Sequence, residues 1–105
     1  MSYTRKATHS GEWYPTDNTL GEMLDSSFAY AEATPEQSEG LKGIISPHSC
    51  YQVCLRTAAH GYARINPDSF ERVFVLGTCH HVPLRTFLFS GASSVETPFG
   101  DLDVE

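Results

Sequence analysis

The sequence has no long apolar run, no cluster of basic residues and no even set of cysteines. Its longest strongly apolar run, 73–76, is far shorter than a membrane span or the core of a secretory signal. Lys and Arg total 7 against 13 Asp and Glu, and the net charge of −6 argues against a nucleic-acid partner. The 3 cysteines, without a secretory signal, indicate free thiols in a reducing compartment. We therefore expect a soluble, cytoplasmic protein without a membrane span.

Several catalytic signatures are also absent. The sequence contains no G-x-S-x-G nucleophile elbow, no phosphate-binding loop and no dinucleotide-binding fingerprint. A hydrophobic fraction of 40% with 19% charged residues is typical of a globular chain. At 105 residues, the chain holds one domain or part of one.

Two segments have the apolar periodicity of amphipathic helices. The first helix is predicted over 18–32, with Asp17 or Asn18 as its N-cap. The second is predicted over 52–65 and ends before the turn at 66–68. Its apolar face comprises Cys54, Leu55, Ala58, Ala59, Tyr62 and Ile65.

Short apolar runs at 43–46 and 72–77 flank the second helix and are predicted to be buried strands. Strand, helix and strand in this order indicate a βαβ unit with parallel strands and a right-handed crossover. Weaker strands are predicted at 86–90 and 101–104. The expected fold class is α/β, with a βαβ-based parallel or mixed sheet flanked by helices.

A histidine follows each of the two main predicted strands. His48 comes shortly after 43–46, and His80 shortly after 72–77. Parallel strands end at one edge of a sheet, so we expect the two imidazoles within about 8 Å, where they could share a metal ion. The alternative is that each histidine only makes hydrogen bonds in its loop. Cys50 and Cys79 are weaker candidates as ligands or nucleophiles.

Other polar and aromatic residues have open roles. His81, next to His80, is either a proton-transfer group or a structural loop residue. His60 lies in the middle of the second helix and is expected to be a packed or surface histidine. Trp13 lies in an aromatic turn near the N-terminus, where packing is the usual role.

Five ordered motifs resemble the Memo family. An H-x-G-x-W-Y turn spans 9–14, and I-I-x-P-H-x-x-Y spans 44–51. A-A-H-x-Y follows at 58–62, L-G-x-x-H-H-V-P at 76–83 and T-P-x-G at 97–100. Their order and spacing hold from about residue 7 to the last residue, so the resemblance covers nearly the whole chain.

The resemblance implies a fold shared with LigB-like class III extradiol dioxygenases, with 1–105 as a single partial domain, the N-terminal third of a three-layer fold. It implies that His48 and His80 are metal ligands, with a third, cysteine ligand far downstream. It also implies that Trp13 and Tyr51 contribute to a pocket for substrate or peptide. The family pattern has Ala-Gly and Pro-Ser where this chain has 49–50 and 78–79; the extra thiols favour softer metals such as copper.

Two functions follow from this resemblance. The first is redox chemistry at a copper or iron site, resembling a dioxygenase, with a small aromatic substrate and with His81 as the catalytic group; whether the chain is an enzyme stays open. The second is a non-enzymatic signalling module that binds phosphotyrosine peptides of ErbB-type receptors and acts in cell motility. No Arg cluster of the kind that usually recognises phosphate is present. We also expect 1–105 alone to self-associate or to be loosely packed, through uncovered apolar surface.

Overall fold

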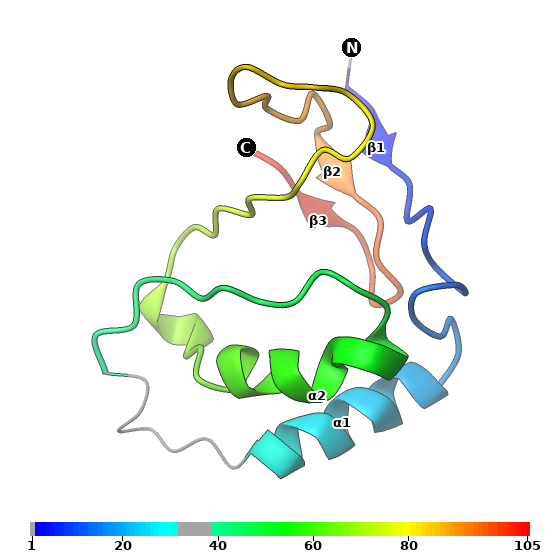
Figure 1. Cartoon of the computed structure of the whole chain (residues 1–105), viewed down its shortest axis with the longest axis vertical. Coiled ribbons are helices and arrows are strands. Elements are labelled where there is room, and N and C mark those ends of the chain that lie inside the picture. Colours follow the sequence, from blue (N-terminus) through cyan, green and yellow to red (C-terminus); the bar gives the residue numbers. More distant parts are fainter. Residues whose placement is uncertain (1, 32–38) are drawn as a thin grey trace. The chain divides into compact units, whose positions relative to one another are not determined.

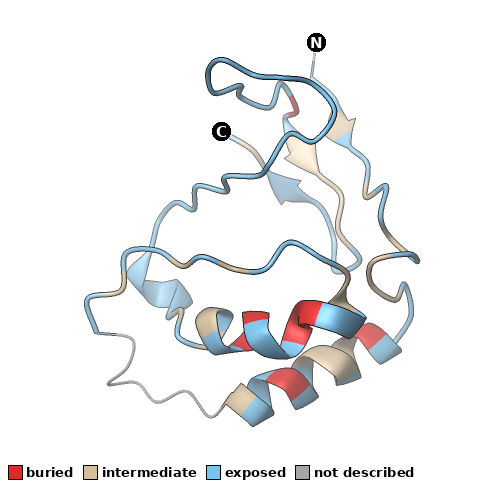
Figure 2. Ribbon diagram, viewed as in Figure 1, coloured by how far each residue is buried: buried red, intermediate tan, exposed pale blue. Residues whose placement is uncertain are grey.

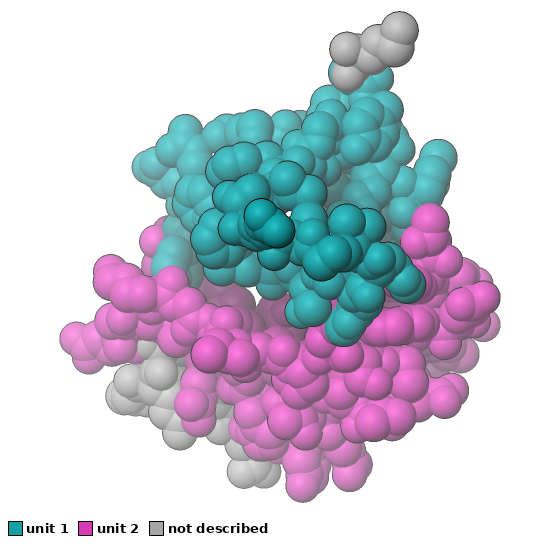
Figure 3. Space-filling view, turned by 45° about the horizontal axis from the view of Figure 1, so that its top comes forward, with its two compact units in different colours: residues 1–7, 70–105 teal, residues 8–69 magenta. Residues whose placement is uncertain are grey.

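The computed structural model describes residues 2–31 and 39–105, and the chain forms two compact units (Figure 3). The first comprises residues 8–69 and carries the helices α1 (Thr19–Ala31) and α2 (Tyr51–Tyr62) and a short 3-10 helix, η2 (Pro67–Ser69). The second comprises residues 1–7 and 70–105 and carries the strands β1 (Thr4–Arg5), β2 (Ser94–Val95) and β3 (Leu102–Asp103) (Figure 1).

Helix α1 begins close to its predicted start, because Asp17 caps it. The Asp17 carboxylate accepts hydrogen bonds from the backbone amide of Thr19, at 3.0 Å, and from the Thr19 hydroxyl. These bonds stabilise the charged carboxylate and hold the pKa of Asp17 below its ordinary value. The predicted end of the helix, residue 32, lies outside the described residues.

The core of the 8–69 unit lies where α1 packs on α2. The buried face of α2 is part of the predicted one, since its buried residues repeat at i, i+1, i+4 and i+5, the spacing of one helix face (Figure 2). Tyr62 of the predicted face is instead exposed. The buried residues of the two helices are Leu20, Ser27, Cys54, Leu55, Ala58 and Ala59.

The second unit is built on a mixed three-stranded sheet. β1 pairs with β2 in parallel, with Thr4 opposite Ser94, and β2 pairs with β3 antiparallel. The hydroxyls of Thr4 and Ser94 are 2.8 Å apart across the parallel pair. The T-P-x-G motif is the turn between β2 and β3, in which the Gly100 amide donates to the Thr97 carbonyl at 3.1 Å. Gly100 has φ 115°, a conformation that favours glycine.

The α/β class and the mixed sheet are confirmed, but the predicted βαβ unit is wrong. Residues 43–46, 72–77 and 86–90 form no strand, and only 101–104 contains one, β3. The parallel pair is made instead by β1 and β2, which the apolar pattern did not indicate. A β-strand makes its backbone hydrogen bonds with a neighbouring strand. The predicted segments pair with no such strand among the described residues. The side chains of 72–77 and 86–90 are accordingly exposed, Phe74 by 86% for example, whereas Ile44 of 43–46 is half-buried.

Glu96, which follows β2, contacts the N-terminal segment at Lys6 and Ala7. These contacts predict how its carboxyl group titrates. Its carboxylate accepts a hydrogen bond from the Ala7 amide at 3.0 Å and pairs with Lys6 at 3.2 Å. The Ala7 bond first, and Lys6 second, lower the pKa of Glu96 from its ordinary 4.5.

We therefore expect this contact to be intact above pH 4.5 and to be lost only as the pH falls through the lower pKa of the folded chain. An NMR titration of the Glu96 carboxyl carbon and the Ala7 amide measures it. Both signals should report one midpoint below 4.5. In Glu96→Gln, which lacks the carboxyl group, the Ala7 amide signal should no longer show this pH-dependent change. A midpoint at or above the ordinary value would contradict the contact.

Among the described residues, no helix has the length and apolar character needed to cross a membrane.

Candidate functional site

The aromatic turn at 9–14 is held by its own backbone. The amides of Glu12 and Trp13 donate to the His9 carbonyl, at 3.1 and 2.9 Å, and the Gly11 amide donates to the Tyr14 carbonyl at 2.9 Å. Gly11 has φ 86°, so this position also favours glycine. The turn fixes the direction in which the indole of Trp13 leaves the backbone.

The turn is joined to the start of α2 by one long-range backbone bond. The Tyr51 amide, the first of the helix, donates to the carbonyl of Trp13 at 2.8 Å. The N-cap residue, Cys50, makes no side-chain capping bond, so the carbonyl of Trp13 satisfies an amide that a Ser or Asp cap would usually serve. This bond brings Trp13 beside the residues that precede α2.

Trp13 consequently contacts two imidazoles. The ring centroids of His9 and Trp13 are 4.7 Å apart with the planes inclined by 23°, a stacked pair. The ring centroids of Trp13 and His48 are 5.4 Å apart, and their planes are tilted by 56°. Such aromatic pairs contribute about 0.5–1.5 kcal/mol each beyond area burial. The indole therefore limits the orientations open to the His48 ring, which is otherwise exposed.

Tyr51 extends this cluster. Its ring centroid lies 5.5 Å from that of Tyr14. Burial, and secondarily the nearby phenol of Tyr62, raises the pKa of Tyr51 above its ordinary value of 10.0, so its hydroxyl keeps its proton at neutral pH. Two sets of ring contacts, His9–Trp13–His48 and Tyr14–Tyr51, are thus joined through the backbone bond from Tyr51 to Trp13. These five residues include the predicted site residues Trp13, His48 and Tyr51 and are here called the His9–Tyr51 cluster: His9, Trp13, Tyr14, His48 and Tyr51.

The other predicted site residues, His80 and His81, belong to the second unit. Both are exposed, as is Cys79 beside them. They lie in a long extended segment without a helix or strand, so the strand-end geometry that predicted a shared site is not formed. A site shared by His48 and His80 stays a prediction.

The donor chemistry fits copper or iron only in part. Imidazole nitrogen is a good ligand for both metals, but two imidazoles fall short of the three protein ligands of a typical site. Within the described ranges, no group of three or more His, Cys, Asp or Glu side chains could hold a metal ion. A complete site therefore needs a ligand beyond the groups that the described residues assemble.

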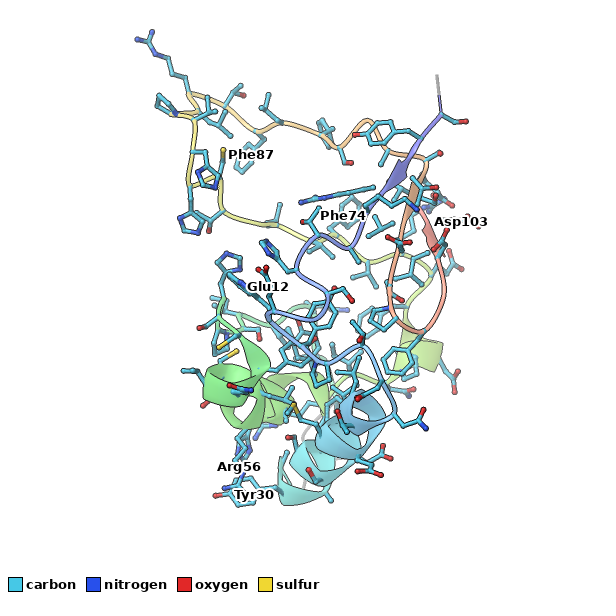
Figure 4. All side chains as sticks on the ribbon, turned by 90° about the vertical axis from the view of Figure 1, so that its right-hand side faces the viewer. Glu12, Tyr30, Arg56, Phe74, Phe87 and Asp103 are labelled. Carbon is cyan, nitrogen blue, oxygen red and sulfur yellow. The ribbon has the colours of Figure 1, made fainter. Side chains whose placement is uncertain are left out.

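His60 has the surface role predicted for it. Its ring lies edge-on to that of Tyr30, with the centroids 5.9 Å apart. The guanidinium carbon of Arg56 lies 4.4 Å from the centroid of the same Tyr30 ring (Figure 4). It is exposed and makes a suitable control for the histidines of the predicted site.

Comparison with known proteins supplies the family. The profile of the Memo family, described as "Memo-like protein", matches residues 5–105. The chain belongs to the Memo family.

The chain resembles individual Memo proteins over almost all of its own length. It is 37% identical over 101 residues to a MEMO1 family protein of Schizosaccharomyces pombe, covering 96% of this chain and 32% of that protein. It is 35% identical to Protein MEMO1 of Danio rerio and 33% to that of Homo sapiens, each match covering 96% of this chain and 33% of the relative. The chain thus spans about a third of the length of these Memo relatives.

His9 and Tyr14 are the two residues of the cluster that sequence reasoning did not identify as site components. Both were visible as the first and last positions of the H-x-G-x-W-Y motif of the Memo family. For His9, the turn motif is the indication in the sequence. The tight turn reverses the direction of the backbone, so that the His9 ring can stack on the indole of Trp13. Histidine and tryptophan four residues apart gave no such indication without the turn geometry.

Proposed function

We propose that this Memo family chain is the N-terminal part of a LigB-like three-layer domain and contributes two imidazole ligands, His48 and His80, to a copper or iron site with redox function. The observation that carries the proposal is the placing of His48 against Trp13, with the ring centroids 5.4 Å apart, shortly before the start of α2. A ligand histidine needs such support, because its ring must hold one orientation.

The remaining residues have defined roles in this proposal. Copper or iron, when bound, would supply the redox chemistry of an oxidoreductase that resembles the dioxygenases. Tyr51 keeps its phenolic proton and, with the indole of Trp13, would offer an aromatic surface to a small aromatic substrate. His81, adjacent to His80 and exposed, is the proposed proton-transfer residue. Residues 1–105 act as one partial domain, and we place the protein in the cytoplasm.

The test is the metal content of the chain after loading with Cu(I) or Fe(II) and dialysis. We expect weak binding, with Cu(I) retained better than Fe(II). Cys50 and Cys79 lie close in sequence to His48 and His80, and thiols are good ligands for soft ions. His48→Ala and His80→Ala should each lower the retained metal at least about tenfold, since even residues that only orient a ligand cost 10–100-fold in affinity.

His60→Ala is the matched control and should retain metal like the parent, since His60 packs on Tyr30. Equal retention in His48→Ala, His80→Ala and the parent would place the metal elsewhere and refute the assignment.

A second candidate function is the binding of phosphotyrosine peptides in signalling and cell motility. The His9–Tyr51 cluster favours it, because stacked imidazole and indole rings offer an aromatic face to a tyrosine ring. Trp13 is the single tryptophan of the sequence, so its fluorescence reports directly on this cluster. The test is a titration with a phosphotyrosine peptide and with the same peptide unphosphorylated. A saturable change in Trp13 fluorescence with the first peptide only would favour this function over the metal site.

A further inference from the structure

Three exposed side chains of the helix pair contact one another and are here called the Tyr30–Arg56 surface: Tyr30 of α1, with Arg56 and His60 of α2. The guanidinium carbon of Arg56 lies over the Tyr30 ring, 4.4 Å from its centroid. The imidazole of His60 lies edge-on to the same ring, with the planes at 72°. Figure 4 shows the two labelled side chains, Tyr30 and Arg56, projecting together from the two helices. All three residues belong to the 8–69 unit.

In the described part of the chain, Arg56 has no carboxylate partner. Helix α2 contains no Asp or Glu that could pair with it along the helix. The ion pairs found among residues 2–31 and 39–105 are formed by other cations, and the Arg56 side chain makes no hydrogen bond there. Yet the chain has 13 Asp and Glu against 7 Lys and Arg, so carboxylates are not scarce. The structure therefore holds this guanidinium on a ring and not on one of the chain's own acidic groups.

The ring contact orients the guanidinium and leaves its donors available. A guanidinium stacked on an aromatic ring uses the face of its plane, while its N–H groups point outward within that plane. His60 contacts the same ring, so two side chains of α2 hold Tyr30. A long, exposed arginine normally loses side-chain entropy when it binds a partner, and here part of that entropy is already lost. Arg56 is thus pre-organised to bind an anion with two oxygen atoms in one plane.

The composition of the surface favours a carboxylate over a phosphate. One guanidinium matches the two oxygens of one carboxylate in a bidentate pair. Phosphate recognition usually employs a cluster of arginines, and Arg56 is the only Lys or Arg of α2. The net charge of −6 also opposes a nucleic acid with its many phosphates. A short acidic peptide carries fewer charges, and physiological salt screens the chain's distant acidic groups beyond about 8 Å.

We propose that the Tyr30–Arg56 surface binds an acidic segment of a partner protein. One Asp or Glu carboxylate of that segment pairs with the guanidinium of Arg56, and a second lies beside His60, one helical turn further along α2. Tyrosine and arginine are also residue types that often carry the binding energy of protein interfaces. The proposal does not rest on the metal site, because none of the three residues is a proposed metal ligand.

The test is an NMR titration of the full 105-residue chain with a hexaglutamate peptide, at about 0.15 M salt. We expect saturable binding that shifts the signals of the Arg56 side chain and of the Tyr30 ring, because the two are in contact. A hexaglutamine peptide has the same length without the carboxylates and should cause no saturable shift.

Substitutions separate a carboxylate site from general charge attraction. Arg56→Gln should weaken the affinity for hexaglutamate at least about fivefold, because it removes a charge-assisted bidentate pair. Arg56→Lys keeps the charge without the planar fork and should lose most of the same affinity. Arg64→Gln is the matched control, since Arg64 is exposed in the same unit and its loss changes the net charge equally. This variant should bind like the parent.

The role of the ring is tested at Tyr30. Tyr30→Ala removes the surface on which the guanidinium lies and should weaken the affinity for hexaglutamate. Tyr30→Phe keeps an aromatic face and should retain most of the affinity. Both substitutions are at an exposed position, 55% accessible, so the fold of the helix pair should survive them.

Four results would overturn the proposal. The first is the absence of saturable hexaglutamate binding, and the second is an equal loss in Arg56→Gln and Arg64→Gln, which would indicate general charge attraction. The third is tighter binding of inorganic phosphate than of hexaglutamate at Arg56, because the ligand would then be a phosphate. The fourth is self-association of the chain that Arg56→Gln abolishes, because the occupant would then be a second copy.

Discussion

Leu55→Ala should lower the free energy of unfolding of the helix pair by about 2–5 kcal/mol, because it removes a large side chain from a small core and leaves a cavity. Leu55 is 6% exposed, on the face of α2 that packs against α1. The other buried residues of α2 are Cys54, Ala58 and Ala59, whose small side chains cannot fill the space. Since small domains have only about 5–15 kcal/mol in total, the variant should be partly unfolded under mild conditions.

Urea denaturation followed by far-ultraviolet circular dichroism measures this effect. Val53→Ala is the matched control, since it shortens an apolar side chain on the same helix at a position that is 76% exposed. It should change the free energy of unfolding by no more than about 0.5 kcal/mol. Equal midpoints for the two variants would mean that α1 and α2 do not share the core described above.

Trp13→Ala should lower the free energy of unfolding by about 1–3 kcal/mol, since it removes two aromatic pairs of about 0.5–1.5 kcal/mol each. The affected contacts are those with His9, at 4.7 Å, and His48, at 5.4 Å. The backbone bond from the Tyr51 amide to carbonyl 13 survives the substitution, so α2 should keep its start. The His48 ring loses its contact with the indole and should sample more orientations.

NMR spectra of the imidazole protons read out this change directly. In Trp13→Ala the His48 signals should move, because the ring current of the indole is gone, while those of His60, packed on Tyr30, should stay. Trp13→Phe is the conservative control and should recover part of both the stability and the His48 shift. Unchanged His48 signals in Trp13→Ala would contradict the ring contact between Trp13 and His48.

The helices illustrate what local sequence can determine. Their hydrogen bonds join residues four apart, so the periodicity of 18–32 and 52–65 was enough to place α1 and α2 within a few residues. The buried residues Cys54, Leu55, Ala58 and Ala59 were predicted for the same reason. The position of β3 within 101–104 was also predicted, together with the chain's place in the Memo family.

The strands and the His9–Tyr51 cluster depended on distant partners. The run 73–76 is apolar enough for a strand, yet it forms none, since a ladder needs a second segment at the right distance. β1 and β2 pair although neither has a strand pattern, because residues 4–5 and 94–95 meet across the chain. Sequence by itself thus determined the helices, the family and the candidate ligands His48 and His80. Only the tertiary structure placed Trp13 against His48, because that contact depends on a hydrogen bond between backbones 38 residues apart, from Tyr51 to Trp13.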